Sequence, residues 1–378
     1  MRSSLWMIRL SLLGLALEVS SPAAREAGAS WEGEWQKVLR AAEKEGQVDV
    51  YGINPVGNNL RVIWEGFQQR FPNIKLNSAI LGRGADMVPK IMAERRAGKY
   101  LADVVLAGPT TLYTTFYPAR ILDPVPPLLL LSEVTDRSQW WQGKHHYVDP
   151  DQQYIFLYEG SLYSPPLSYN TKLVNAEEIR SVWDVLQPKW RGKIEALHVK
   201  TNIGGSTGLI FLYHHAQIGP RFIEKLYQEM EVTLFRDFRQ ATDWLAQGRF
   251  TFCLLCRDIQ RAAEQGLPVA ELHPYRLKEL PGIGAGNGAI GFMKQAPHPN
   301  AAKVFINWYL SREGQIAFRQ ANRDNDRKTS LREDLPLDIL PELARRSADR
   351  EYLFINRPEW MDFEPVRALI ERISGKGG

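Results

Sequence analysis

The sequence is poor in cysteine, with only Cys253 and Cys256 among its 378 residues. Two cysteines cannot build the dense disulfide framework of a small secreted domain, and a cysteine-based zinc site needs about four ligands. Residues three apart on a β-strand point to opposite faces, so a bond between these two needs an intervening turn. We therefore expect buried free thiols in the apolar segment 250–256, in preference to a disulfide, a redox pair or a metal site.

The only long apolar run that could be a targeting segment or a membrane anchor lies at the N-terminus. Residues 5–17 are almost entirely apolar and follow the positively charged Arg2, but they are too few to span a bilayer comfortably. Ala27-Gly28-Ala29 has the A-x-A pattern of a cleavage site. These features predict a signal peptide over residues 1–29 and export of the mature chain to the periplasm.

No dense tract of basic residues occurs, and the net charge of +4 is spread thinly along the chain. A nucleic-acid partner is therefore not expected. The chain shows no internal repeat and no low-complexity tract, and its length allows a substantial core without disulfides or metals.

Strand and helix patterns alternate along the first third of the mature chain. Such alternation is typical of a mainly parallel sheet with helices on its faces. The expected helices are 31–45, 60–71 and 85–97, and the expected strands are 47–51, 74–77 and 102–106.

Several stretches resemble the extracellular solute-binding proteins of ABC importers, in the branch that includes ferric-iron binders. Residues 288–315 are similar to that family's strand, A-P-H-P loop, helix and L-S-x-E-G-Q turn. Residues 169–194 and the Ala102-Asp103-Val104-Val105 strand match further pieces, and their order and spacing agree over residues 45–320.

The resemblance implies an α/β, two-lobed periplasmic-binding-protein-like type II fold. Each lobe is then a mainly parallel sheet flanked by helices, joined to the other by crossing strands, with one crossing near residues 168–171. The expected division is lobe 1 at 30–168 plus 290–325, lobe 2 at 169–289, and a C-terminal helical tail at 326–378 packing on the lobes. Such a protein binds a small solute by hinge closure, delivers it to an inner-membrane permease, acts as a monomer and needs no cofactor.

Loops at strand ends are expected to face the cleft between the lobes, where open α/β sheets bind ligands. Residues 204–207 open a helix, whose free amides and dipole favour an anionic group. Arg83 stands between glycines, where its guanidinium can grip a carboxylate or phosphate. The predicted ligand-binding residues are Asn54, Asn58, Arg83, Thr110, Thr111, Asn170, Gly205, Ser206, Thr207, Arg257 and Asp258.

The iron branch of the family uses an adjacent pair of tyrosines at the end of the strand that here reads 252–256. This sequence has Arg257-Asp258 at that place, and an arginine repels a trivalent cation. We therefore expect an anionic organic or phosphorylated solute. A ferric-iron or iron–anion binder is one alternative, and a ligand-sensing adaptor for a receptor is a second that the sequence does not separate.

An enzyme is the competing class, because residues 204–208 match the G-x-S-x-G motif of hydrolases. Asp258 and then His273 or His298 would supply the remaining triad members. The motif needs a buried strand directly before it, whereas residues 199–203 are polar. We expect no catalytic residues, and no metal site at His145-His146 or His214-His215, because neighbouring side chains point in different directions.

Overall fold

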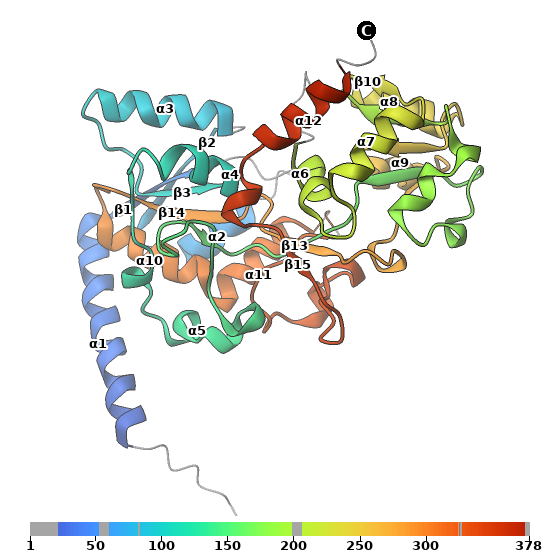
Figure 1. Ribbon diagram of the computed structural model, residues 1–378. Coiled ribbons are helices and arrows are strands. Elements are labelled where there is room, and N and C mark those ends of the chain that lie inside the picture. Colours follow the sequence, from blue (N-terminus) through green and yellow to red (C-terminus); the bar gives the residue numbers. More distant parts are fainter. Residues whose placement is uncertain are drawn as a thin grey trace, which may run out of the picture.

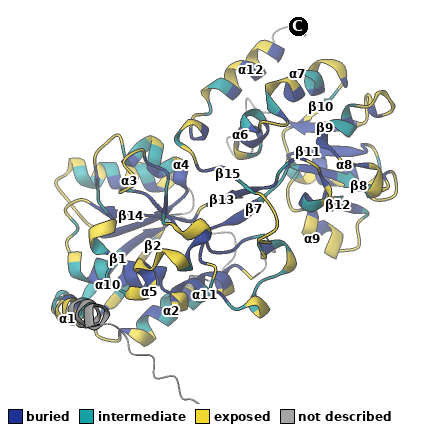
Figure 2. Ribbon diagram, turned by 60° about the horizontal axis from the view of Figure 1, so that its bottom comes forward, coloured by how far each residue is buried: buried dark blue, intermediate teal, exposed yellow. Residues whose placement is uncertain are grey.

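Strand pairing divides the chain into two lobes joined by a small central sheet (Figure 1). The computed structural model describes residues 22–52, 60–81, 84–198, 206–323, 325 and 327–374. Within these ranges, lobe 1 is built on a seven-stranded sheet, lobe 2 on a five-stranded sheet, and three strands lie between them. Buried residues concentrate in all three sheets (Figure 2), so the two cores form around the sheets and continue through the connection.

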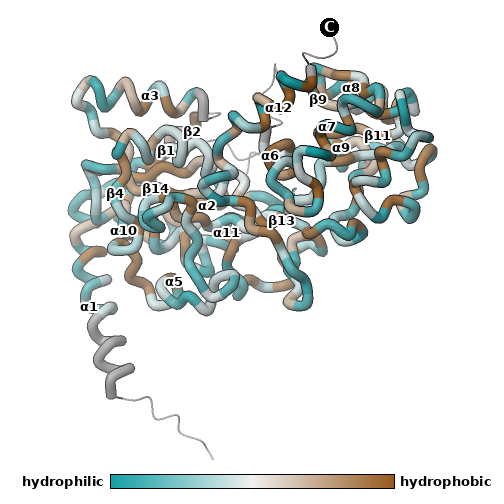
Figure 3. The backbone as a smooth tube through the Cα atoms, viewed as in Figure 1, coloured by the Kyte–Doolittle hydropathy of each residue, from teal (hydrophilic) through white to brown (hydrophobic). Residues whose placement is uncertain are grey.

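The sheet of lobe 1 has the order β2-β1-β3-β14-β6-β5, with β4 also paired to β14. β1 runs parallel to both β2 and β3, whereas β14 runs antiparallel to β3, β4 and β6. The apolar strand β14 shows as a brown segment inside the lobe in Figure 3. The strands are β1 Gln47–Gly52, β2 Lys75–Ile80, β3 Val104–Ala107, β4 Leu122–Asp123, β5 His146–Tyr147, β6 Phe156–Leu157 and β14 Ala289–Met293.

Helices cover this sheet because their apolar faces meet in an aromatic cluster. Phe67 lies 5.4 Å from the rings of both Phe305 and Trp308, measured between centroids. α1 packs on α10, and α2 packs on α11. α2 and α3 agree with the helices expected at 60–71 and 85–97, whereas α1 begins nine residues before the start expected at residue 31. The helices are α1 Pro22–Glu45, α2 Leu60–Arg70, α3 Gly84–Arg96, α10 Pro299–Leu310 and α11 Arg312–Ala321.

The sheet of lobe 2 has the order β10-β9-β11-β8-β12. β9 is parallel to β10 and β11, but β8 is antiparallel to β11 and β12. Both lobe sheets are therefore mixed, which corrects the expectation of mainly parallel sheets. The elements are β8 Leu167–Asn170, β9 Ile194–Leu197, β10 Thr233–Phe235, β11 Phe252–Leu254, β12 Val269–Glu271, α6 Ser206–His214, α7 Gly219–Glu229, α8 Phe238–Ala246 and α9 Ile259–Glu264.

The hinge sheet between the lobes consists of β7 (Ser161–Tyr163), β13 (Gly282–Gly284) and β15 (Leu353–Phe354). β13 pairs antiparallel with β7 and parallel with β15. A Cβ on Gly284 would lie 2.5 Å from Ile355, so glycine is needed for the tail to approach β13. The crossing at β7 lies earlier than residues 168–171, which belong to β8 and the turn after it.

The tail, residues 327–374, passes from lobe 1 along the hinge to lobe 2. Its first part runs beside β7, where the amide of Gly160 donates to the carbonyl of Thr329. It continues through β15 and the 3₁₀ turn η13 (Pro358–Trp360) to α12 (Glu364–Ser374), which packs on α7 and α6 (Figure 1). Strand and 3₁₀ turn thus replace much of the helix that the sequence predicted here.

The two cysteines form a disulfide, which corrects the expectation of free thiols. β11 ends at Leu254, and Leu255 then adopts a left-handed conformation with φ of 67°. This turn brings Cys256 back toward Cys253, with 5.8 Å between their Cα atoms. A bulky apolar residue rarely adopts such a conformation, so the intervening turn gave no signal in the sequence.

The turn between α10 and α11 explains one family-like motif and supports a prediction. Ser311 caps α11 by accepting from the amide of Gly314, which packs against the last turn of α10. A Cβ on Gly314 would overlap the carbonyl oxygen of Trp308 and lie 2.6 Å from that of Tyr309. We expect Gly314→Ala to lower the free energy of unfolding by about 1–3 kcal/mol in urea titrations.

Gly33 provides a matched control for this substitution. It lies in α1 with no neighbouring atom within 4 Å of an added Cβ. Gly33→Ala should be neutral or stabilising by up to about 1 kcal/mol. Equal unfolding midpoints for the two variants would show that the close packing of Gly314 against the end of α10 does not contribute to stability.

None of the described helices is both long and apolar enough to cross a bilayer.

Candidate functional site

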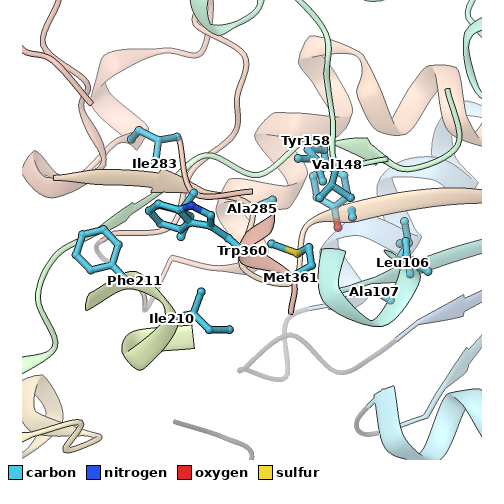
Figure 4. Close-up of a cluster of buried hydrophobic side chains, with 14 of the residues drawn as sticks. Leu106, Ala107, Val148, Tyr158, Ile210, Phe211, Ile283, Ala285, Trp360 and Met361 are labelled. Carbon is cyan, nitrogen blue, oxygen red and sulfur yellow. The ribbon is translucent and has the colours of Figure 1, made fainter. Parts of the chain in front are cut away.

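One pocket receives residues from both lobes, from the hinge sheet and from the tail. Its volume is about 40 Å³. Figure 4 shows Trp360 and Met361 of the tail between Ile210 and Phe211 of lobe 2 and Leu106 and Ala107 of lobe 1. The residues lining this interlobe pocket are Pro109, Thr110, Tyr163, Thr207, Ile210, Gly286, Ile355, Asn356, Trp360 and Met361.

Lobe 1 contributes a helix N-terminus to the pocket. The buried strand β3 leads through Gly108 into α4 (Pro109–Thr111), which continues as the π-helical turn Leu112–Phe116. Pro109 at the first helical position favours a helix start, and the extended cap residue Gly108 has no side chain to occupy the following amides. The exposed Thr110 therefore presents both a hydroxyl and the positive end of a helix to the pocket.

Lobe 2 contributes a second helix N-terminus from the opposite side. α6 begins at Ser206, and its first turn carries the exposed Thr207 and the buried Ile210. Gly208 lets this helix approach the turn after β11, because a Cβ there would lie 3.0 Å from Pro166 and would overlap Leu255. Two helix starts on different lobes thus face one small space.

The tail closes the pocket and contacts both lobes. The Sδ atom of Met361 lies 3.5 Å from the hydroxyl oxygen of Thr110 in lobe 1. Trp360 is only 5% exposed and stacks on His214 of α6, with 5.3 Å between ring centroids and 18° between planes. The tail therefore fills much of the space that a solute would need, and a cavity of this size holds about one water molecule.

The hinge contributes neutral polar groups. The side-chain oxygen of Asn356 accepts from the amide of Ala285 at 2.5 Å, which fixes β15 against the loop after β13. Burial raises the pKa of Tyr163, so this phenol stays protonated at neutral pH. A protonated phenol offers the pocket a hydrogen-bond donor and an acceptor.

The predicted site residues divide between this pocket and other places. Thr110 and Thr207 come together in the interlobe pocket. Thr111 follows on α4 and is half-buried beside it. Asn54, Asn58, Arg83 and Gly205 lie outside the described residues, as does the side chain of Ser206.

Arg257 and Asp258 lie elsewhere, after the disulfide turn. Arg257 lines a second pocket of about 290 Å³, next to Cys256, and its guanidinium sits 4.3 Å from the ring centroid of Phe238. Asp258 is exposed and begins α9 with a left-handed φ of 57°. Neither lines the interlobe pocket. This second pocket also contains Arg327, which pairs with Glu271 at 2.6 Å.

Asn170 is a structural residue of lobe 2, which corrects its assignment to the site. It is 2% exposed, and its amide nitrogen donates to the carbonyl oxygen of Leu245 at 2.8 Å. Its side-chain oxygen accepts from the amide of Lys172. These bonds close the turn after β8 and join it to the end of α8, which holds the buried side chain inside lobe 2.

Two clusters of potential metal ligands occur among the described residues, and both have another explanation. In the first, Asp103 accepts from the amide of Asp49 and from the amide and the Nδ1 atom of His298. These bonds tie the A-P-H-P loop to β1 and β3. In the second, Glu195 lies beside Cys253 and Cys256, whose sulfurs are bonded to each other and offer no thiolate.

The histidines also have structural partners. His145 and His146 bond through Nε2 to the carbonyls of Val134 and Trp141, and His273 accepts from the amide of Tyr275. With His298 held by Asp103, neither histidine proposed for a hydrolase triad is oriented toward a serine by the bonds it makes.

The geometry defines a class of protein: two α/β lobes, a three-stranded hinge and a pocket between them constitute the type II periplasmic-binding-protein fold. No protein-family model matches the sequence, and no curated protein sequence matches it. Solved structures do match, at identities that establish the fold alone.

Three of these structures illustrate how the described ligands and roles differ among proteins with this fold. The Trichodesmium protein IdiA (FutA), in complex with iron and citrate, is 17% identical, with a TM-score of 0.62 over 87% of this chain and 99% of its own. AfuA of Actinobacillus pleuropneumoniae, with bound fructose-6-phosphate, is 18% identical, with a TM-score of 0.55 over 86% and 97%. A protein described as a signal-transducing two-component system protein is 19% identical, with a TM-score of 0.54 over 86% and 99%. The two-lobed fold predicted from the sequence is confirmed.

Proposed function

We propose that this chain is the exported solute-binding component of an ABC importer, which captures a small solute between its lobes and passes it to a membrane permease. The observation that carries this proposal is the pocket lined from both lobes and from the hinge. A solute held there contacts parts of the protein that move relative to each other, so its binding favours closure.

The solute proposed is an anionic organic or phosphorylated molecule. The N-termini of α4 and α6 approach the pocket from opposite lobes, and helix N-termini favour anions through free amides and the helix dipole. Among the described residues that line the pocket, none carries a negative charge that would repel such a ligand. A solute of this class would bridge the two helix starts and hold the lobes together.

The small volume of the pocket implies a movement before binding. A cavity of about 40 Å³ does not admit a sugar phosphate or a citrate. Opening must separate α4 from α6 and withdraw Met361 from Thr110. The hinge strands β7 and β13, together with β15 of the tail, are the segments that bend.

The proposal is tested by isothermal titration calorimetry of the purified chain against fructose 6-phosphate, citrate, inorganic phosphate, ferric citrate and ferric nitrilotriacetate. We expect micromolar or tighter binding of at least one organic anion without iron. Tight binding of ferric ion from nitrilotriacetate, with no binding of any iron-free anion, would overturn the solute class. Uptake of the bound solute by cells, lost when the gene is deleted, distinguishes import from a sensor that docks a receptor.

A further inference from the structure

The disulfide of lobe 2 lies beside a carboxyl group that the fold does not explain. Cys253 on β11 is directly opposite Glu195 on the parallel neighbour β9. A carboxyl oxygen of Glu195 and the sulfurs of Cys253 and Cys256 all lie within 4.8 Å of one another. The carboxyl group is therefore an immediate neighbour of both sulfurs.

Glu195 is costly to keep in this position. Its side chain is completely buried, and neither of its carboxyl oxygens has a hydrogen-bond partner. Burial raises its pKa to about 8, against the opposing field of Arg249, so the carboxyl is mostly protonated at neutral pH. An unpaired buried polar group lowers stability, so a residue kept here at that cost is a candidate for a chemical role.

The two sulfurs differ in access from outside. Cys253 is fully buried, whereas Cys256 is partly exposed and lines the second pocket, of about 290 Å³. A small thiol or an extended cysteine-containing segment that enters this pocket meets Cys256 first. Thiol–disulfide exchange requires one sulfur to be open to attack and the other to leave.

We propose that Cys253–Cys256 is a thiol–disulfide exchange site that reacts with a dithiol reductant and uses Glu195 as its proton donor. A thiolate of the reductant attacks the sulfur of Cys256, forming a mixed disulfide and breaking the Cys253–Cys256 bond. The sulfur of Cys253 leaves with the electron pair and takes the proton of Glu195, which becomes a carboxylate. The second thiolate of the reductant then attacks the reductant sulfur that is bonded to Cys256 in the mixed disulfide. This step closes a disulfide within the reductant and releases Cys256 as a thiolate. The protein gains two electrons, and the reductant becomes a disulfide.

Exchange at this site would change the loop that follows it. Leu255 and Asp258 both have left-handed φ angles, of 67° and 57°, and the disulfide closes the turn that contains Leu255. Breaking the bond removes the link between Cys256 and β11, and it leaves a carboxylate on β9 next to a thiol on β11. The site thereby couples the redox state of the surroundings to the second pocket.

The first experiment measures the rate at which dithiothreitol reduces the folded protein at pH 7, with alkylation and mass spectrometry of the released thiols. Glu195→Gln keeps the shape and burial of the side chain but cannot transfer the proton. We expect this variant to be reduced at least about tenfold more slowly than wild type. This factor is smaller than the rate acceleration that a positioned general acid typically provides. Glu279→Gln replaces another buried carboxyl, which accepts from the amide of Val182, and should react at the wild-type rate.

Reduction rates measured in denaturant distinguish an effect of the folded site from an intrinsic difference in the reactivity of the disulfide. In 6 M guanidinium chloride, wild type and both variants should be reduced at the same rate. Equal rates for folded wild type and folded Glu195→Gln would overturn the role of Glu195. Reduction of wild type only at the rate of global unfolding would overturn the exchange site itself.

Single-cysteine variants provide a test that does not depend on how Glu195→Gln folds. In Cys253→Ser, we expect Cys256 to form a mixed disulfide with 5,5′-dithiobis(2-nitrobenzoate) in the folded state. In Cys256→Ser, the buried Cys253 should react at least about 100-fold more slowly. Equal reactivity of the two thiols, or no reaction of Cys256, would contradict the assigned order of attack.

Discussion

Replacing Lys328 by methionine is expected to lower the free energy of unfolding by about 3–5 kcal/mol. The ammonium of Lys328 lies 3.2 Å from a carboxyl oxygen of Glu159, and the two side chains are only 10% and 3% exposed. Methionine keeps the length of the side chain but leaves the carboxyl of Glu159 without its countercharge. Burial already raises the pKa of that carboxyl, and Lys328 opposes the shift. Urea unfolding monitored by circular dichroism measures the loss.

The position of this ion pair links it to the hinge. Glu159 lies just before β7 and packs against Gly286 and Gly288, which connect β13 to β14. Lys328 belongs to the part of the tail that runs beside β7. The pair therefore fastens the tail to the base of the hinge, and we expect Lys328→Met to loosen the tail as well as to destabilise the fold.

Two further variants test whether the uncompensated charge of Glu159 causes the loss of stability. Adding Glu159→Gln to Lys328→Met removes the stranded charge, so most of the lost stability should return. Lys189→Met breaks an exposed pair with Glu178, in which the side chains are 50% and 55% exposed, and should change stability by less than about 0.5 kcal/mol. Similar losses for Lys189→Met and Lys328→Met would contradict this account.

Placing a carboxylate at either helix start is expected to weaken solute binding at least about 100-fold. In Thr207→Glu or Thr110→Glu, the new side chain occupies the end of the pocket that is assigned to the anion. Like charges brought together in an interface cost several kcal/mol, so the Kd for the best anion of the panel should rise at least about 100-fold. A glutamate in the first turn of a helix stabilises that helix by about 0.3–1 kcal/mol, so the variants should fold.

Calorimetry on the folded variants provides the readout. Thr171→Glu is the control, because Thr171 is exposed on lobe 2 and lines neither pocket. Its Kd should stay within about twofold of wild type. If Thr207→Glu and Thr110→Glu retain full affinity, the solute does not bind at the two helix starts.

The sequence predicts the fold well where local pattern and burial agree. The helices of lobe 1 and strands β1 and β3 follow from apolar periodicity, and the match at residues 288–315 corresponds to β14, α10 and α11. The antiparallel direction of β8 and β14 could not be predicted, because strand direction depends on where the chain crosses between lobes. The position of that crossing cannot be inferred from the apolar residues of a strand.

The site was only partly predictable. Thr110 and Thr207 follow from helix-start signals at strand ends, whereas Asn170 has the same kind of signal but bonds within its own lobe. The contribution of Trp360 and Met361 depends on pairing between β13 and β15, which are far apart in the sequence. One signal for it was present: glycines alternate from Gly282 to Gly288, which leaves one side of that segment bare for another segment to approach.

The crystal structure of the complex with the tightest-binding anion tests the central claim most directly. The account predicts that the anion lies between the amides at the starts of α4 and α6, with Met361 moved away from Thr110. An anion bound beside Arg257 in the second pocket, with the interlobe pocket unchanged, would contradict it.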